Sequence, residues 1–316
     1  MNLALERRLA RWKQEGKISP EQHLTLTGLA AERPFSVFLE LNALLYIGVL
    51  SFIGGLGWTI QTYFSRLGDA AVLLGLNGLL IGCLYFCFRR GRPYARGEVA
   101  SPALVFDYVL YLGCLAWSVE LTYLEMRFHL LGAQWDGYLF LSAFFFFVMA
   151  YRFDNRFVLS LALSALAAWC GLKTSSFGWF NGAAYRGPAL IFAALTAGLG
   201  GLLRAKKIKN HFFGTYLHFA ANAFFIAAVS GAVRNHGYGL WLLALLGGAA
   251  VAAVYGVKRR QFIFVAYAVV YAYIGLSARV INILDGETAA LFYLAVSAFA
   301  VVMALTLLAR RMGSDA

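Results

Sequence analysis

The sequence predicts an all-α membrane protein: a polytopic transmembrane helical bundle of about ten spans, preceded by a short cytosolic helical hairpin. Apolar residues make up 61% of the 316-residue chain and charged residues only 13%, whereas soluble domains are nearer half apolar and a quarter charged. Apolar runs of about 20 residues recur along the chain, and that length crosses a bilayer as a helix. The net charge of +12 lies in short clusters between these runs, so we expect a lipid bilayer and no nucleic acid as partner.

The first 36 residues are polar and amphipathic, which predicts a cytosolic hairpin. Leu5, Leu9 and Trp12 share one helical face in the first half. Ser19 is suited to be the N-cap of a second helix, and Gln22 stands where a capping box needs an amide. We therefore expect residues 1–36 to form a separate module, which is a possible docking site for a cytosolic protein partner.

The transmembrane helical bundle is expected to fill residues 37–316. Its fourth and fifth runs are shorter than a comfortable span and have only five residues between them, so a re-entrant pair is the alternative for residues 137–172. The expected spans are 37–63, 69–88, 102–121, 137–151, 157–172, 187–203, 212–233, 239–257, 261–281 and 288–309.

Lysine and arginine orient the bundle, because they are enriched in cytoplasmic loops. With the N-terminus inside, the inner segments carry 21 of these 27 residues and the outer segments carry 6. Dropping the fourth and fifth spans leaves the split at 19 to 8. The sequence therefore predicts that both termini are cytoplasmic.

Tryptophan shows a second asymmetry. Apart from Trp12, every tryptophan lies at an expected outer end or in an outer loop. An aromatic belt at the membrane interface is the favoured interpretation, and an outer vestibule that binds an amphiphile or a sugar is the alternative. The residues are Trp58, Trp117, Trp135, Trp169, Trp179 and Trp241.

Cysteines and small residues favour structural roles. The four cysteines lack the paired spacing of a zinc site or a redox dithiol, so we expect no metal and no cofactor. Small residues at every fourth position let helix backbones approach closely in lipid. Three such faces are expected: Gly78 with Gly82; Ala193, Ala197 and Gly201; and Gly248, Ala252 and Gly256.

Two spans carry polar stripes, and polar or ionisable groups inside a membrane are candidate functional sites because burying them is costly. We expect Asn77 in the second span, and Tyr267 with Tyr271 in the ninth, to meet these stripes. The third span carries Asp107, Tyr111, Cys114, Ser118, Thr122 and Glu125 on one face. The seventh span carries His211, Thr215, His218 and Asn222.

Three interpretations of the stripes stay open. Hydrogen bonds from helix to helix would specify the bundle. Alternatively, Asp107 and His218 lie at similar depth and form a protonatable pair along an inward polar pathway. Catalysis has the least support, because the chain lacks metalloprotease, phosphate-loop and nucleophile-elbow motifs.

The N-terminal third contains a recognisable set of residues: Leu5, Arg8, Leu9, Trp12, Gly16, Ile18, Ser19, Glu21, Gln22, Gly48, Gly54, Gly55 and Trp58. With these residues, it resembles a family of bacterial predicted multi-pass membrane proteins of unknown function. The resemblance implies a bacterial inner-membrane location and brings no activity or site residues. A weaker, architectural resemblance is to ten-helix drug and metabolite transporters.

The expected function is transport or export of a small molecule or lipid-linked precursor through a polar cavity between helices. The first alternative is a structural or regulatory membrane protein whose hairpin recruits a cytosolic partner. The second is a membrane-embedded, lipid-modifying enzyme.

Overall fold

The computed structural model contains only helices as regular structure within the residues it describes. The chain divides into two compact units, Met1–Arg66 and Leu67–Ala316. The expected domain boundary after residue 36 stays a prediction, because it falls in an undescribed segment. The described residues are 12–13, 16, 19–31, 38–134, 136–176, 185–233, 238–284 and 286–314.

The first unit contains α2 (Pro20–Ala31) and α3 (Phe38–Leu67). The capping box is present: Gln22 N–H donates to Ser19 Oγ at 3.1 Å, and Ser19 N–H donates to Gln22 Oε1 at 2.9 Å. This reciprocal pair satisfies two backbone donors at the start of α2. Leu5 and Leu9 lie outside the described residues, so the hairpin itself is not tested.

The second unit is a series of helices at the positions that hydropathy predicts. The largest difference is in α5, which continues seven residues beyond the expected end at Leu121. Thr122 and Glu125 are therefore helical. The helices are α4 (Asp69–Arg90), α5 (Leu104–Phe128), α6 (Gly137–Phe153), α7 (Arg156–Ser176), α8 (Arg186–Ala205), α9 (Phe213–Val233), α10 (Tyr238–Arg259), α11 (Phe262–Ile281) and α12 (Glu287–Ser314), with short 3₁₀ turns at Gly132–Gln134 and Asn210–Phe212.

Within the described residues, seven helices are long and apolar enough to cross a membrane: α4, α5, α8, α10, α11, α12, and α9 together with the 3₁₀ turn before it. Three further apolar stretches, Leu44–Thr59, Gly137–Phe153 and Arg156–Leu172, are shorter. The chain is therefore a multi-pass helical membrane protein, and the count of ten stays a prediction.

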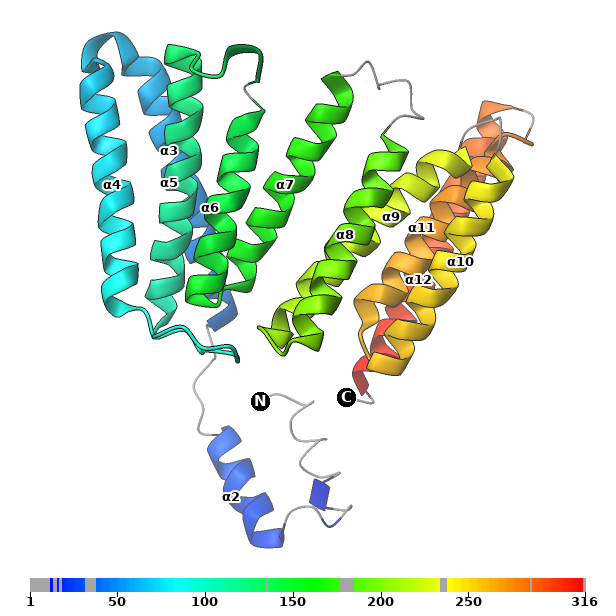
Figure 1. Ribbon diagram of the computed structural model, residues 1–316. Coiled ribbons are helices and arrows are strands. Elements are labelled where there is room, and N and C mark those ends of the chain that lie inside the picture. Colours follow the sequence, from blue (N-terminus) through cyan, green and yellow to red (C-terminus); the bar gives the residue numbers. More distant parts are fainter. Residues whose placement is uncertain are drawn as a thin grey trace. The chain divides into compact units, whose positions relative to one another are not determined.

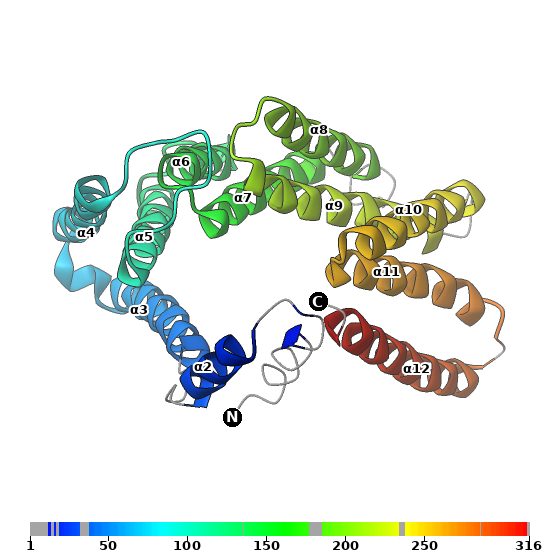
Figure 2. The same ribbon diagram turned by 90° about the horizontal axis from the view of Figure 1, so that it is seen from below.

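Helices of the second unit contact one another in chain order from α4 to α12, as Figures 1 and 2 show. The core of its C-terminal half lies between α9, α10 and α11, where Phe225, Leu245 and Ala228 are buried. Phe225 stacks on Tyr271, with ring centroids 4.9 Å apart. Apolar packing between consecutive hairpins thus holds these helices together.

The three expected small-residue faces have different outcomes. A Cβ at Gly248 would lie 2.3 Å from Phe224, and one at Gly256 would lie 2.6 Å from Val265, so this face packs closely. A Cβ at Gly78, Gly82 or Gly201 would meet no described atom within 4 Å. Close packing at these three glycines therefore stays a prediction, because periodicity does not show which face of a helix has a neighbour.

The loops after α4, α6, α8 and α10 lie together at the lower end of the second unit in Figure 1. We call this the basic end, since these loops contain most of the unit's clustered arginines and lysines. At the opposite end, Arg186 donates to Ser230 O at 2.8 Å and Arg279 donates to Ala232 O at 2.8 Å. Two guanidinium groups thus satisfy carbonyls at the C-terminus of α9, which helix geometry leaves unpaired.

Candidate functional site

A buried ionic network at the basic end joins the turn after α6, the turn after α8 and the loop between α4 and α5. The carboxylate of Asp154 lies 3.0 Å from Lys209 Nζ and 2.5 Å from His211 Nε2. All three side chains are nearly inaccessible, with exposed fractions of 2% for Asp154, 1% for Lys209 and 8% for His211. We call these three residues the buried triad. Buried charges require such pairing, because desolvation is otherwise too costly.

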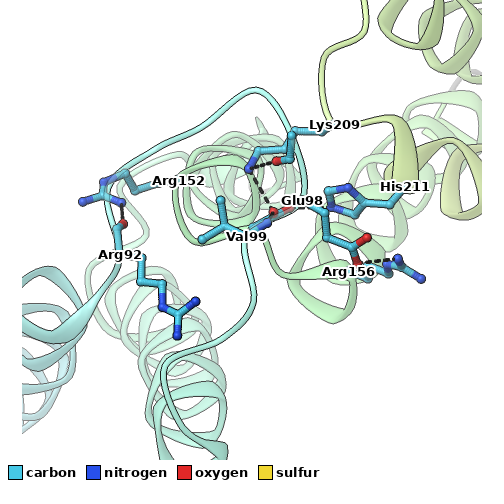
Figure 3. A network of polar contacts seen from close by, with 9 residues as sticks. Arg92, Glu98, Val99, Arg152, Arg156, Lys209 and His211 are labelled. Carbon is cyan, nitrogen blue, oxygen red and sulfur yellow. Dashed lines mark hydrogen bonds and ion pairs between the residues drawn. The ribbon is translucent and has the colours of Figure 1, made fainter.

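The triad also holds the loop between α4 and α5. Asp154 accepts a hydrogen bond from Val99 N–H. Lys209 donates from Nζ to Gly97 O at 3.1 Å and from its backbone N–H to Arg96 O at 2.8 Å. Figure 3 shows Lys209 and His211 beside this loop. One carboxylate and one ammonium therefore fasten the α4–α5 loop to the turns after α6 and α8.

Backbone conformation at two turns makes the triad possible. Asp154 ends α6 with φ 58°, and Lys209 follows α8 with φ 47°. The left-handed region is uncommon for residues other than glycine, asparagine and aspartate. These two turns redirect the chain so that side chains from separate hairpins meet.

A cavity of about 560 Å³ opens beside the triad. Arginines reach it from three elements: Arg156 at the start of α7, Arg204 at the end of α8 and Arg259 at the end of α10. We call it the basic cavity. Its described lining residues include no carboxylate, and they are Arg156, Arg204, Asn210, His211, Phe213, Gly214, Thr215, His218, Tyr255, Arg259 and Gln261.

The cavity is suited to an anion. Arg204 lies over the Phe213 ring at 4.7 Å, a contact that orients the guanidinium. Arg156 pairs with Glu98 of the α4–α5 loop at 2.9 Å, and both side chains are more than half exposed, as Figure 3 shows. Guanidinium groups bind phosphate and carboxylate oxygens in a fork geometry. The volume falls within the range of small-molecule sites.

The stripe of the seventh span contributes to this cavity. Thr215 and His218 line it. The His218 ring stacks on Phe264 at 4.6 Å, and its buried Nδ1 has no hydrogen-bond partner among the described residues. Tyr271 of the ninth span donates to Asn222 Oδ1 at 2.7 Å. The structure thus brings together the seventh and ninth spans, as the sequence predicts.

The stripe of the third span has a different role. Asp107 and Tyr111 both accept hydrogen bonds from Asn155 Nδ2, at 3.0 and 3.1 Å. The side-chain oxygen Oδ1 of Asn155 in turn accepts hydrogen bonds from two backbone N–H groups at the start of α7. Asp107 therefore supports a helix cap and does not pair with His218. The described contacts join Asp107 to Asn155 and not to His218, so the shared polar pathway stays a prediction.

Three further residues of that stripe form hydrogen bonds within α5 or with the loop that follows it. Ser118 donates to Cys114 O at 3.4 Å, and Thr122 donates to Ser118 O at 2.8 Å. Glu125 accepts from Leu131 N–H in the following loop at 3.1 Å. These contacts satisfy polar groups inside α5 and at its end.

Sequence reasoning missed Glu120. Its Oε1 accepts a hydrogen bond of 2.6 Å from Asn77 Nδ2 in α4, and it is only 8% exposed. Asn77 therefore does meet the third span, but not at its stripe. Glu120 is an ionisable residue inside the expected span 102–121, and that signal was available. It lies off the stripe, so a search by periodicity passes over it.

No cluster of three or more histidine, cysteine, aspartate or glutamate residues suits a metal ion within the part of the chain that the structure describes. Cys83, Cys87 and Cys114 are buried free thiols, and Cys170 is half-buried. Their packing agrees with the structural role expected for them.

Fold and site together define a multi-pass α-helical membrane protein with an arginine-rich cavity at one end of the bundle. Residues 10–159, just under half of the chain, match the model of a family described as predicted membrane protein (DUF2157), whose function is unknown. The resemblance seen in the sequence is thereby confirmed over this part of the chain. No curated protein and no solved structure matches the chain.

Proposed function

We propose that this protein binds an anion of the phosphate type in the basic cavity and transports it across the membrane. The observation that carries the proposal is the convergence of Arg156, Arg204 and Arg259 on one cavity without a lining carboxylate among its described residues. Three guanidinium groups at one site repel each other, and an anion relieves that repulsion.

The basic end is proposed to face the cytoplasm of a bacterial cell, with both termini on that side of the inner membrane. The supporting observation is the excess of lysine and arginine in the loops of this end. A cytoplasmic opening gives the cavity access to phosphorylated compounds made inside the cell, which favours export over uptake.

Replacing both Arg204 and Arg259 with glutamine should weaken binding of inorganic phosphate by about tenfold or more, since charge-assisted hydrogen bonds to phosphate contribute about 1.5 to 3 kcal/mol each. The affinity is measured by titration calorimetry on the purified protein in detergent. The matched control replaces Arg310 and Arg311 of α12 with glutamine, because neither lines the cavity. Equal affinities for all three proteins would overturn the binding site.

Transport is tested separately with the same variants. Proteoliposomes loaded with radiolabelled phosphate should release it through the unaltered protein and through the α12 control. The cavity variant should release it at least about tenfold more slowly. Phosphate binding without release would restrict the proposal to a binding protein.

Replacing Glu98 with glutamine should increase phosphate affinity about two- to fivefold, because Glu98 competes with the ligand for Arg156. The pair is exposed, so its loss should leave the melting temperature nearly unchanged. Calorimetry and thermal unfolding of the same preparation measure both quantities. Weaker phosphate binding would mean that Glu98 orders Arg156 instead of occupying it.

A second candidate function, recruitment of a cytosolic protein by residues 1–36, is favoured by apolar exposure on α2. Leu24 is 72% exposed and Leu26 38%. Replacing both leucines with serine should abolish co-purification of a specific partner from cells, while Thr25→Ala on the same helix should leave it intact. A partner that is retained by the double variant would contradict this role.

A further inference from the structure

Two apolar grooves of about 420 Å³ each lie among α6, α7, α8 and α9. One is bounded by α7, α8 and α9, and the other by α6, α7, α8 and the first turn of α9. They share Cys170, Pro188 and Phe192. Apart from Ser164, Thr196, Asn222 and two tyrosines, their lining side chains are apolar.

Helix α9 connects the grooves to the basic cavity. Thr215 and His218 line the cavity, Tyr216 lines one groove, and Phe219 with Asn222 lines the other. Phe219 follows His218 directly, and Asn222 lies four residues after His218, which is about 6 Å along a helix axis. The basic cavity and the two apolar grooves thus share α9 as a wall, and their lining residues on this helix are neighbours in the chain.

The grooves lie where hydrocarbon is expected. Both α8 and α9 meet the length and hydropathy of membrane spans. Side chains at the groove edge on α8 are exposed, with Ile191 at 61% and Leu195 at 68%. An apolar groove bordered by exposed leucine and isoleucine, at this depth, is open to lipid chains and not to water.

We infer that the ligand is a lipid with a phosphate head group, whose head binds in the basic cavity and whose hydrocarbon chain lies in the grooves beside α8. This inference rests on the proposed function and names its ligand class. Charge complementarity fixes the head at the arginines. Burial of a chain in an apolar groove adds affinity with each methylene, which a soluble phosphate compound lacks.

A chain-length series tests the inference without altering the protein. Phosphatidic acids with progressively longer acyl chains, presented in mixed micelles, should compete with a fluorescent phosphatidic acid more strongly as the chains lengthen. Long-chain phosphatidic acid should bind at least about tenfold more tightly than glycerol 3-phosphate. Equal affinities for both would overturn the lipid assignment while leaving the phosphate site in place.

Filling a groove gives the second arm of the test. Ala167→Trp places a large ring in the groove beside α9, whereas Ala168→Trp changes the next residue of α7, which is exposed and lines neither groove. The first variant should lose about tenfold or more in affinity for long-chain phosphatidic acid and keep its affinity for inorganic phosphate. The second should keep both.

The outcomes separate the two proposals. If inorganic phosphate binds but the groove variant and chain length have no effect, the ligand is a soluble anion and the lipid inference fails. If phosphatidic acid binds and the Arg204 and Arg259 variant does not weaken it, the head group lies elsewhere and the inference also fails. If neither compound binds, the proposed function itself fails.

Discussion

Replacing Asp154 with asparagine is expected to lower the free energy of unfolding by about 3 to 5 kcal/mol, because removal of one partner leaves a buried charge uncompensated. Lys209 would remain at 1% exposure without its carboxylate. Asparagine offers one side-chain oxygen where aspartate offers two, so it cannot replace both the Oδ1 contact with His211 and the Oδ2 contact with Val99 N–H. Thermal unfolding in detergent, followed by tryptophan fluorescence, measures the loss.

A double replacement provides the control for this prediction. Lys209→Met in the Asp154→Asn background removes both charges, so it should recover much of the lost stability. Glu98→Gln breaks an exposed ion pair in the loop that the triad holds, and it should cost less than about 1 kcal/mol. An Asp154 variant as stable as the Glu98 variant would show that the triad does not stabilise the basic end.

Replacing Gly231 with leucine should destabilise the C-terminal half by about 3 kcal/mol, since overpacking a close helix contact strains the backbone. A Cβ at Gly231 would lie 2.2 Å from the Trp241 ring and 2.7 Å from its Cβ. The Cβ of tryptophan is fixed to the α10 backbone, so the helices must separate. The melting temperature in detergent is again the measurement.

Gly78→Leu is the matched control in α4. A Cβ at this position meets no described atom within 4 Å, so the larger side chain should be tolerated with a change below about 0.5 kcal/mol. Equal losses for both variants would mean that glycine content, and not close packing, sets stability in these helices.

The buried triad also bears on the proposed binding site. His211 lines the basic cavity while its Nε2 contacts Asp154. The same carboxylate holds the loop that carries Glu98, the partner of Arg156. Asp154 therefore positions both His211 in the cavity wall and the loop that carries Glu98, the anion that competes for Arg156. Asp154 supports the binding site and does not itself contact the ligand.

Hydropathy located the helices well. Both ends of α9, α10 and α11 fall within two residues of their expected positions, because a membrane requires long apolar helices with polar breaks. The Ser19 and Gln22 capping box was likewise readable, since both partners lie within four residues. Local patterns of this kind need no knowledge of neighbours.

Contacts between helices could not be read in the same way. Asp107 was expected near His218 and bonds instead to Asn155, a residue that looks like part of a short loop. Lys209 resembled one more cationic loop residue and proved to be buried. Helical periodicity shows which residues share a face, but not which neighbour that face meets.

The sequence by itself determined a multi-pass helical membrane protein, the approximate helix ends and the end of the bundle where its cationic residues gather. Those features follow from hydropathy and charge, which act on each segment separately. Only the tertiary structure decided that Arg156, Arg204 and Arg259 converge on one cavity and that Asp154 joins Lys209 to His211. Such groups are far apart in the chain, and only packing between hairpins sets the distances over which their charges act.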